Sequence, residues 1–385
     1  MSLAKSNVPF KATDKEHSTP HPRMFAAVAA LTSLIHAHPG EEHDATEVVK
    51  EATLRHTIAD INSYAVGQCV NDVETLDRKQ RAMERRMDTF RNLQANRGIV
   101  NDQQIYRRNN VQFAKWGQVS HDRTGKVDFT KSTPHVEVFG ANTTCIMTPD
   151  NIIGPYYVLG EQIRSNVVEG HRGVPVHLEI QFVDVQDCKP VSGLLVDIWQ
   201  CNATGVYSGV SAAGQGGLKS TFLRGVQQTD KDGVVEFDTI FPGHYQGRAT
   251  HIHVSAHTGS SILPNNTFTG GDVNHISQLF FDQALISAVE KLAPYNTNRI
   301  PLTTNARDLY SGYAATEAYD PFPEYVFLDG KDLSQGLFMW IEVAINTKAN
   351  YNDYAIVAAI LGPEGGKNNP KYSLIKAITP PPTHG

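Results

Sequence analysis

Short runs in which apolar and polar residues alternate fill the chain between about residues 174 and 282. A period of two places successive side chains on opposite faces of a strand, and turn-forming Gly, Pro, Asp and Asn separate the runs. This spacing predicts a mainly β fold, an antiparallel sandwich or barrel-like core, in place of a βαβ arrangement. The predicted strands are VPVHLEIQFVDV (174–185), GLLVDIWQC (193–201), GVVEFDTI (233–240), THIHVSAH (250–257) and QLFFD (278–282).

Helical spacing dominates residues 45–100, where a Met/Phe/Leu stripe runs through DRKQRAMERRMDTFRNLQAN and Gly98 follows as a stop signal. The stripe predicts packing against the main body or against a second subunit, which would make a homodimer through these helices. A short helix is expected at 282–296 and a late strand at 334–345. The expected division of the chain is 1–37 extension and leader, 38–110 helical region, 111–148 connector, 149–350 β-sandwich and 351–385 loose C-terminal tail.

An apolar run from Phe25 to Ile35 precedes a small residue, Ala37, and an acidic stretch. This order is typical of a secretory signal peptide cleaved after Ala37, and the run is too short to anchor the chain in a bilayer. A short core helix is the alternative interpretation. Met24 is an alternative start, because residues 1–23 form a long polar extension before the run. We therefore expect an extracellular protein.

Composition agrees with a secreted globular protein. The 385 residues carry a formal charge of −6 and are 40% hydrophobic, which argues against nucleic-acid binding and permits a large core. Four cysteines suit two disulfides. A strand of roughly eight residues, about 26 Å long, separates Cys188 from Cys201, so we expect Cys145–Cys201 and Cys69–Cys188 instead. Glycosylation sequons begin at Asn142, Asn202 and Asn265.

The stretch PGHYQGRATHIHV (242–254) carries the candidate chemistry. On a strand, His251 and His253 share one face about 6.6 Å apart, so that both rings can reach one ion, while His257 is a poor third ligand. Without Cys, Asp or Glu nearby, neither a usual structural zinc site nor a two-histidine, one-carboxylate iron site fits. Tyr245, and Tyr207 after another strand, are available as ligands. Phenolate oxygens suit a strongly Lewis-acidic ion such as ferric iron.

The ordered set GVYSG, PGHY and RATHIH resembles the intradiol ring-cleavage dioxygenases, in a secreted fungal-type form, over roughly residues 145–345. The resemblance implies one non-haem Fe(III) per chain, an aromatic diol and O2 as substrates, and cis,cis-muconate-type products. The segment between Tyr245 and His251 is shorter than in catechol and protocatechuate enzymes, so the preferred diol is not implied. The residues implied are the iron ligands Tyr207, Tyr245, His251 and His253, the catalytic Arg248 and Tyr245 with the supporting Gln278, and the pocket residues Ile152, Pro155, Tyr156 and Arg248.

Two other functions compete with this one. A secreted β-sandwich could be a binding module that lacks iron, or that holds zinc or copper through the two histidines. Cleavage after Ala37 would also leave His38 at the N-terminus, where amine and imidazole could chelate copper in a monooxygenase. The complete ligand set favours the dioxygenase over both.

Overall fold

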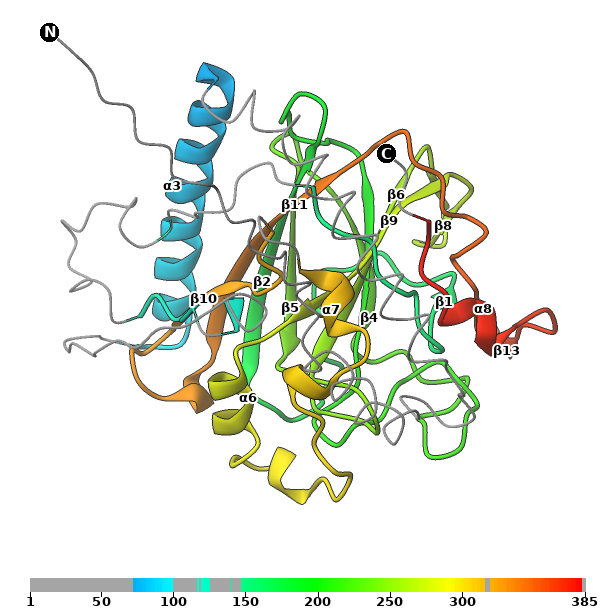
Figure 1. Ribbon diagram of the computed structural model, residues 1–385. Coiled ribbons are helices and arrows are strands. Elements are labelled where there is room, and N and C mark those ends of the chain that lie inside the picture. The colour runs from blue at the N-terminus through cyan, green and yellow to red at the C-terminus, as the bar shows by residue number, and fades with distance from the viewer. Residues whose placement is uncertain are drawn as a thin grey trace, which may run out of the picture.

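The computed structural model describes residues 72–99, 116–117, 119–124, 139, 147–315 and 319–382. Two four-stranded sheets pack face to face, which confirms the mainly β fold (Figure 1). The first sheet has the order β10-β11-β2-β5 and the second β4-β3-β6-β9. Their bounds are β2 Pro175–Asp184, β3 Leu195–Trp199, β4 Arg224–Gln228, β5 Val234–Ile240, β6 His251–Thr258, β9 Asp272–Phe280, β10 Glu324–Phe327 and β11 Leu337–Ile345.

The alternating pattern of these strands builds the core. Alternate residues of β2, β3, β6 and β11, such as Leu178, Ile198, Val254 and Ile341, meet between the sheets. All pairs within the two sheets are antiparallel except β11 with β2, which run parallel. Strand β9 begins at Asp272, six residues before the expected start, because Val273–Ile276 continue the ladder with β6.

Helix α3, Val73–Asn96, covers the outer face of the first sheet (Figure 1). Its Met87 and Phe90 pack on Phe338 and Trp340 of β11, so the apolar stripe lies against the chain's own sheet. Gly98 follows at φ +65°, the left-handed conformation that commonly ends a helix. The leader, the part of the expected helical region before residue 72 and most of the connector lie outside the described residues. The homodimer stays a prediction.

The segment after residue 350 is packed, so a loose tail was a wrong expectation up to residue 382. Strand β12 pairs with the short strand β1, and Gly154 N donates to Ala377 O at 2.9 Å. The apolar residues of this segment bury Tyr157 and Trp199, which gives it a reason to order. The remaining elements are β1 Val158–Leu159, β7 Ser261–Ile262, β8 Phe268–Thr269, β12 Ala359–Gly362, β13 Gly365–Asn368, α6 Gln283–Val289, α7 Ser311–Ala314, α8 Leu374–Ala377, and the 3-10 turns η1 Tyr295–Thr297, η2 Asn305–Arg307 and η3 Leu333–Gln335.

Cys201 is a free, buried thiol, so the predicted Cys145–Cys201 bridge is wrong. It follows β3, and its Sγ donates to Gly243 O at 3.3 Å inside the packed core. Burial raises its pKa to about 12, which keeps the thiol protonated. Cys188 is disulfide-bonded, but Cys69 lies outside the described residues, so the Cys69–Cys188 pairing stays a prediction. None of the described helices is both long and apolar enough to cross a bilayer.

Candidate metal centre and substrate cavity

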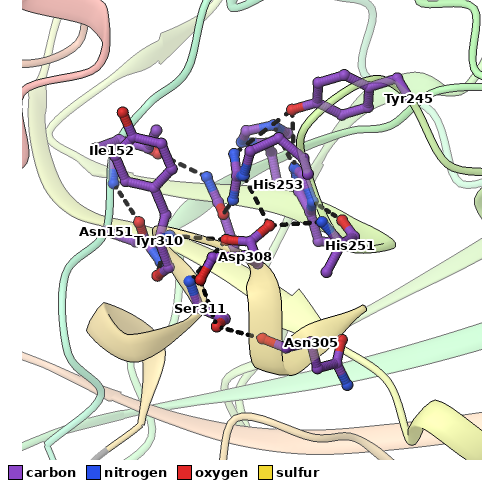
Figure 2. Close-up of polar contacts among 12 residues, drawn as sticks. Asn151, Ile152, Tyr245, His251, His253, Asn305, Asp308, Tyr310 and Ser311 are labelled. Atoms are coloured by element: carbon purple, nitrogen blue, oxygen red, sulfur yellow. Dashed lines mark hydrogen bonds and ion pairs between the residues drawn. The ribbon is translucent and has the colours of Figure 1, made fainter. Parts of the chain in front are cut away.

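Two histidines of β6 and two tyrosines from neighbouring loops converge on the outer side of the second sheet. His251 and His253 point the same way, as the strand period requires, and their Nε2 atoms lie 3.0 Å apart. The hydroxyl of Tyr245, after β5, lies 3.5 Å from His251 Nε2 and points at both imidazoles (Figure 2). Tyr207, after β3, completes the group, with its ring centroid 5.3 Å from that of Tyr245 and 6.2 Å from that of His253.

Local contacts fix the two imidazoles. His251 Nδ1 lies 2.6 Å from Ala249 O and must donate to it, which leaves a lone pair on the inward-facing Nε2. The ring of His253 stacks on Trp199 at 4.7 Å with an interplanar angle of 7°. Gly154, at φ +80°, faces the same ring, and a Cβ there would lie 2.8 Å from His253 Cε1. A glycine at residue 154 is therefore required for this ring position.

His244 anchors the turn that carries Tyr245. The Nδ1 of His244 lies 2.7 Å from Glu290 Oε1 and its Nε2 lies 2.7 Å from Ile300 O, so both nitrogens have acceptor partners. Asn298 Nδ2 also donates to His244 O at 2.8 Å. The turn is thus tied to α6 and to the loop after it.

The donor set fits a hard trivalent cation. Tyr207 is fully buried, and its hydroxyl has no hydrogen-bond partner. Burial, and then the neighbouring Tyr245, raise the pKa of the Tyr207 phenol well above its usual value, so a nearby cation is needed to make it a phenolate. Two nitrogens 3.0 Å apart match ligands at right angles about 2.1 Å from one ion. Elsewhere in the described ranges, no group of three His, Cys, Asp or Glu side chains could hold a metal.

Arg248 lies beside the ligands and is fully buried. Its Nε donates to Asp308 Oδ2 at 2.9 Å, its Nη2 donates to Gln278 Oε1, and its Nη1 lies 3.5 Å from the Tyr245 hydroxyl. Burial lowers its pKa, but Asp308 together with Tyr245 and Tyr310 outweighs burial and the net shift is upward, so Arg248 keeps its charge. Gln278 Nε2 in turn donates to Ile152 O at 3.2 Å, and the guanidinium lies 4.8 Å from the centroid of the Tyr310 ring.

A cavity of about 600 Å³ opens beside Tyr245. Pro155 and Tyr156, two of the expected pocket residues, line it. Tyr156 also contacts both tyrosines that are candidate ligands, with its ring centroid 4.7 Å from that of Tyr207. Ile152 and Arg248 are not among the lining residues: Ile152 is buried in a cluster around Tyr310. Both therefore contribute to the site from behind the cavity wall.

Several known dioxygenases are similar to this chain. A family model described as "Dioxygenase" matches residues 152–261. Catechol 1,2-dioxygenase 1 of Acinetobacter lwoffii is 35% identical over 179 residues, which make up 40% of this chain and 54% of that protein. An intradiol ring-cleavage dioxygenase from Tetranychus urticae is 30% identical, with a TM-score of 0.44, and the match covers 54% of this chain and 97% of that structure.

The chain belongs to the intradiol ring-cleavage dioxygenases. It spans about half the length of the curated relative it matches. The dioxygenase domain of a carbohydrate-binding fusion protein from Streptomyces sp. SirexAA-E is also similar, at 25% identity and a TM-score of 0.34, over 51% of this chain and 97% of that structure.

The sequence did not predict a role at the site for two residues, Asp308 and Trp199. Asp308 binds Arg248 and also accepts a hydrogen bond from Ala249 N at 2.6 Å (Figure 2). It lies 60 residues after Arg248 in the sequence, in a polar loop with no periodic pattern. Trp199 stood inside a predicted strand, and only the pairing of β3 with β6 places it opposite His253. The strand register could therefore have predicted the contact between Trp199 and His253, whereas nothing in the sequence pointed to Asp308.

Proposed function

We propose that this protein is an extracellular non-haem Fe(III) dioxygenase that cleaves catechol-type rings between the two hydroxylated carbons. The co-substrate is O2, and the products are cis,cis-muconate-type diacids. The observation that carries the proposal is the buried, partnerless hydroxyl of Tyr207 beside Tyr245 and two converging imidazoles. Catechol 1,2-dioxygenase of Acinetobacter lwoffii, by its name, acts on catechol, and its similarity supports the substrate class. Extracellular location rests on the leader alone.

Tyr207, Tyr245, His251 and His253 would hold one iron ion. When bound, ferric iron supplies Lewis acidity that favours the deprotonated diol and withdraws electron density from its ring. Tyr245 is the ligand best placed to exchange a proton with a diol, since this residue lines the cavity and its hydroxyl lies 3.5 Å from Arg248 Nη1. Arg248, fixed by Asp308 and Gln278, keeps a positive charge beside the same oxygen and stabilises negative charge that develops there.

Iron analysis and a visible spectrum of the mature protein test the proposal. We expect one iron per chain, a tyrosinate charge-transfer band, and a shift of that band when catechol is added under nitrogen. Oxygen uptake with catechol should then begin on admitting air. A protein that stays colourless after reconstitution with ferric salt would overturn the dioxygenase and favour the binding module.

Secretion is tested separately. Expression in a secreting host, followed by N-terminal sequencing of the protein in the medium, should give a chain that starts at His38. A product retained inside the cell with residues 1–37 intact would contradict the proposed location and leave the iron chemistry untouched.

A further inference from the structure

The cavity beside Tyr245 is much larger than a simple catechol needs. At about 30 Å³ for each water-sized group, 600 Å³ accommodates about 20 such groups, far more than one ring and two oxygens. Its inner end is formed by Tyr156 and Tyr245, and its rim by the exposed loop 211–214. A diol held at the inner end would therefore leave most of the cavity for a substituent on its ring.

Within the described part of the chain, no charged side chain lines this cavity. The 18 described lining residues are apolar or uncharged polar, among them Val206, Val210, Ile300 and Leu374 on the apolar side. The uncharged polar residues include Gln215, Gln246 and Asn368, which can exchange hydrogen bonds with hydroxyl, ether or carbonyl groups.

A carboxylate on the substrate would find no cation among the described residues that line this cavity. The buried guanidinium of Arg248 is not among the lining groups and is already bound by Asp308 and Gln278. A buried ionised carboxylate without a cation is costly, whereas each buried methylene is worth about 0.8 kcal/mol, or about fourfold in affinity.

The wall is coupled to the ligands. Gln215 Oε1 accepts from Tyr207 N at 2.6 Å, so the loop that carries the rim also holds the backbone of a ligand tyrosine. The rim of the cavity is therefore joined by a hydrogen bond to the backbone of Tyr207.

We propose that this dioxygenase selects catechols with a large, uncharged ring substituent and discriminates against catechols that carry a carboxylate. The inference rests on the proposed function and specifies its substrate class. It is carried by the volume and the charge-free lining of the cavity, because the size admits the substituent and the lining rejects the charge.

The test compares kcat/KM at pH 7 for catechol, a series of 4-alkylcatechols, 3,4-dihydroxybenzoate and methyl 3,4-dihydroxybenzoate. The acid and its methyl ester have similar shapes and differ in charge. We expect kcat/KM to rise from 4-methyl- to 4-butylcatechol, by up to about fourfold per methylene, and the ester to exceed the acid at least about 100-fold. Equal rates for acid and ester, or a fall in kcat/KM along the alkyl series, would overturn the inference. Loss of the proposed function itself would look different, since catechol would then not be cleaved either.

A matched pair of variants tests the role of the lining. Ala213 is an exposed lining residue on the rim, so a longer side chain there can extend into the cavity mouth. Ala213→Lys should raise the acid-to-ester ratio of kcat/KM at least about tenfold, because it supplies the missing cation, and Ala213→Gln should leave that ratio unchanged. If lysine and glutamine have the same effect on the ratio, the uncharged wall is not what rejects the carboxylate.

Discussion

The outer faces of the two sheets both bury polar and charged side chains, but they neutralise them differently. On the first sheet, Glu179 is fully buried and accepts from Arg85 at 3.0 Å and from Arg86 at 2.7 Å, both on α3. Glu342 of β11 accepts from Arg78 at 2.6 Å. The chain itself supplies the opposite charge for each of these carboxylates.

The second sheet gathers electron-pair donors around His251 and His253 on its outer face, and the buried arginine beside them is already paired with a carboxylate. The imidazoles of β6 and the two tyrosine hydroxyls converge, while Arg248 beside them is bound by Asp308. A buried polar group without a hydrogen-bond partner lowers the stability of the fold by about 1–3 kcal/mol. The comparison teaches that the first face is built to hold a helix of the same chain, and the second is suited to a cation that the chain does not contain.

The largest effect should come from removing one oxygen on the second face. Tyr207→Phe keeps the ring and deletes a hydroxyl that has no hydrogen-bond partner, so the free energy of unfolding of the iron-free protein should stay equal or rise by about 1 kcal/mol. Iron binding and the visible band should be lost, and catechol cleavage should fall at least about 10³-fold, because a metal ligand is missing. Iron analysis, absorption spectra and oxygen uptake measure this.

Tyr157→Phe is the matched control, because Tyr157 is an equally buried tyrosine whose hydroxyl bonds to Ser255 outside the ligand set. It should lose about 0.5–1.5 kcal/mol of stability and keep the iron spectrum. If Tyr207→Phe binds iron as the parent does, the contrast between the two faces fails.

The next effect tests the first face. Glu179→Ala leaves Arg85 and Arg86 without their carboxylate and should lower the free energy of unfolding by about 3–5 kcal/mol. Urea denaturation measures this, with Asp88→Ala as the control: the Asp88–Arg91 pair on the same helix is exposed and 4.0 Å apart, so its loss should cost less than about 0.5 kcal/mol. A loss below about 1 kcal/mol for Glu179→Ala would mean that α3 is not held by its arginines.

A smaller effect separates the positioning residues of the two faces. Gln278→Leu removes a side chain that fixes Arg248, so iron should still bind while kcat falls about 10- to 100-fold. Gln181 of β2 is a matched buried glutamine that bonds to Arg78 and to Asp232 O. Gln181→Leu should reduce stability and leave kcat of the folded protein unchanged. Equal kcat values for the two variants would remove Gln278 from the site.

The last effect is the pH dependence of a contact between the two sheets. His121 lies 2.6 Å from Asp282, which follows β9, and 2.7 Å from Asp320, which precedes β10. Burial lowers its pKa, but the two carboxylates outweigh burial and raise it to about 10. The charged histidine therefore stabilises the fold fully below about pH 6.5, and this stabilisation is lost as the pH rises to about 10.

Urea midpoints of the parent and of His121→Gln between pH 6 and 10.5 measure this term. The difference in stability between them should shrink steadily as the pH rises over that range, because the charged contact with the two carboxylates is lost with the proton. A difference that stays constant with pH would show that the fold does not raise the pKa of His121.

Residue order alone was sufficient to predict the donor side of the candidate site. In THIHVSAH, the alternation places both histidines on one face and Ile252 and Val254 in the core, as the structure has them. Strand periodicity is a local property, so it survives without knowledge of the fold. The ligand roles of these residues stay a prediction until iron is measured.

The charge pairs could not be predicted in this way. LEIQF has the pattern of an ordinary strand, which does not reveal that Glu179 is buried. The α3 sequence has an apolar stripe, but the stripe does not say which surface it packs against. Only tertiary packing brings Arg85 and Arg86 to Glu179, about 90 positions away, and Asp308 to Arg248. The Cys145–Cys201 pairing failed for the same reason, because spacing excludes some bridges but does not say that Cys201 is enclosed by the Gly243 turn.

Strand β2 pairs with β11, a strand that is synthesised much later, so folding of the first sheet depends on the order of synthesis. Strand β2 ends at Asp184, and β11 begins at Leu337, 153 residues later. At about 5–20 residues per second, a growing chain waits roughly 8 to 30 s between making the two strands. Throughout that interval one long apolar edge of β2 lacks its neighbour, and such an edge readily pairs with other chains. The yield of folded protein should therefore depend on how well a host cell shields nascent chains during this delay.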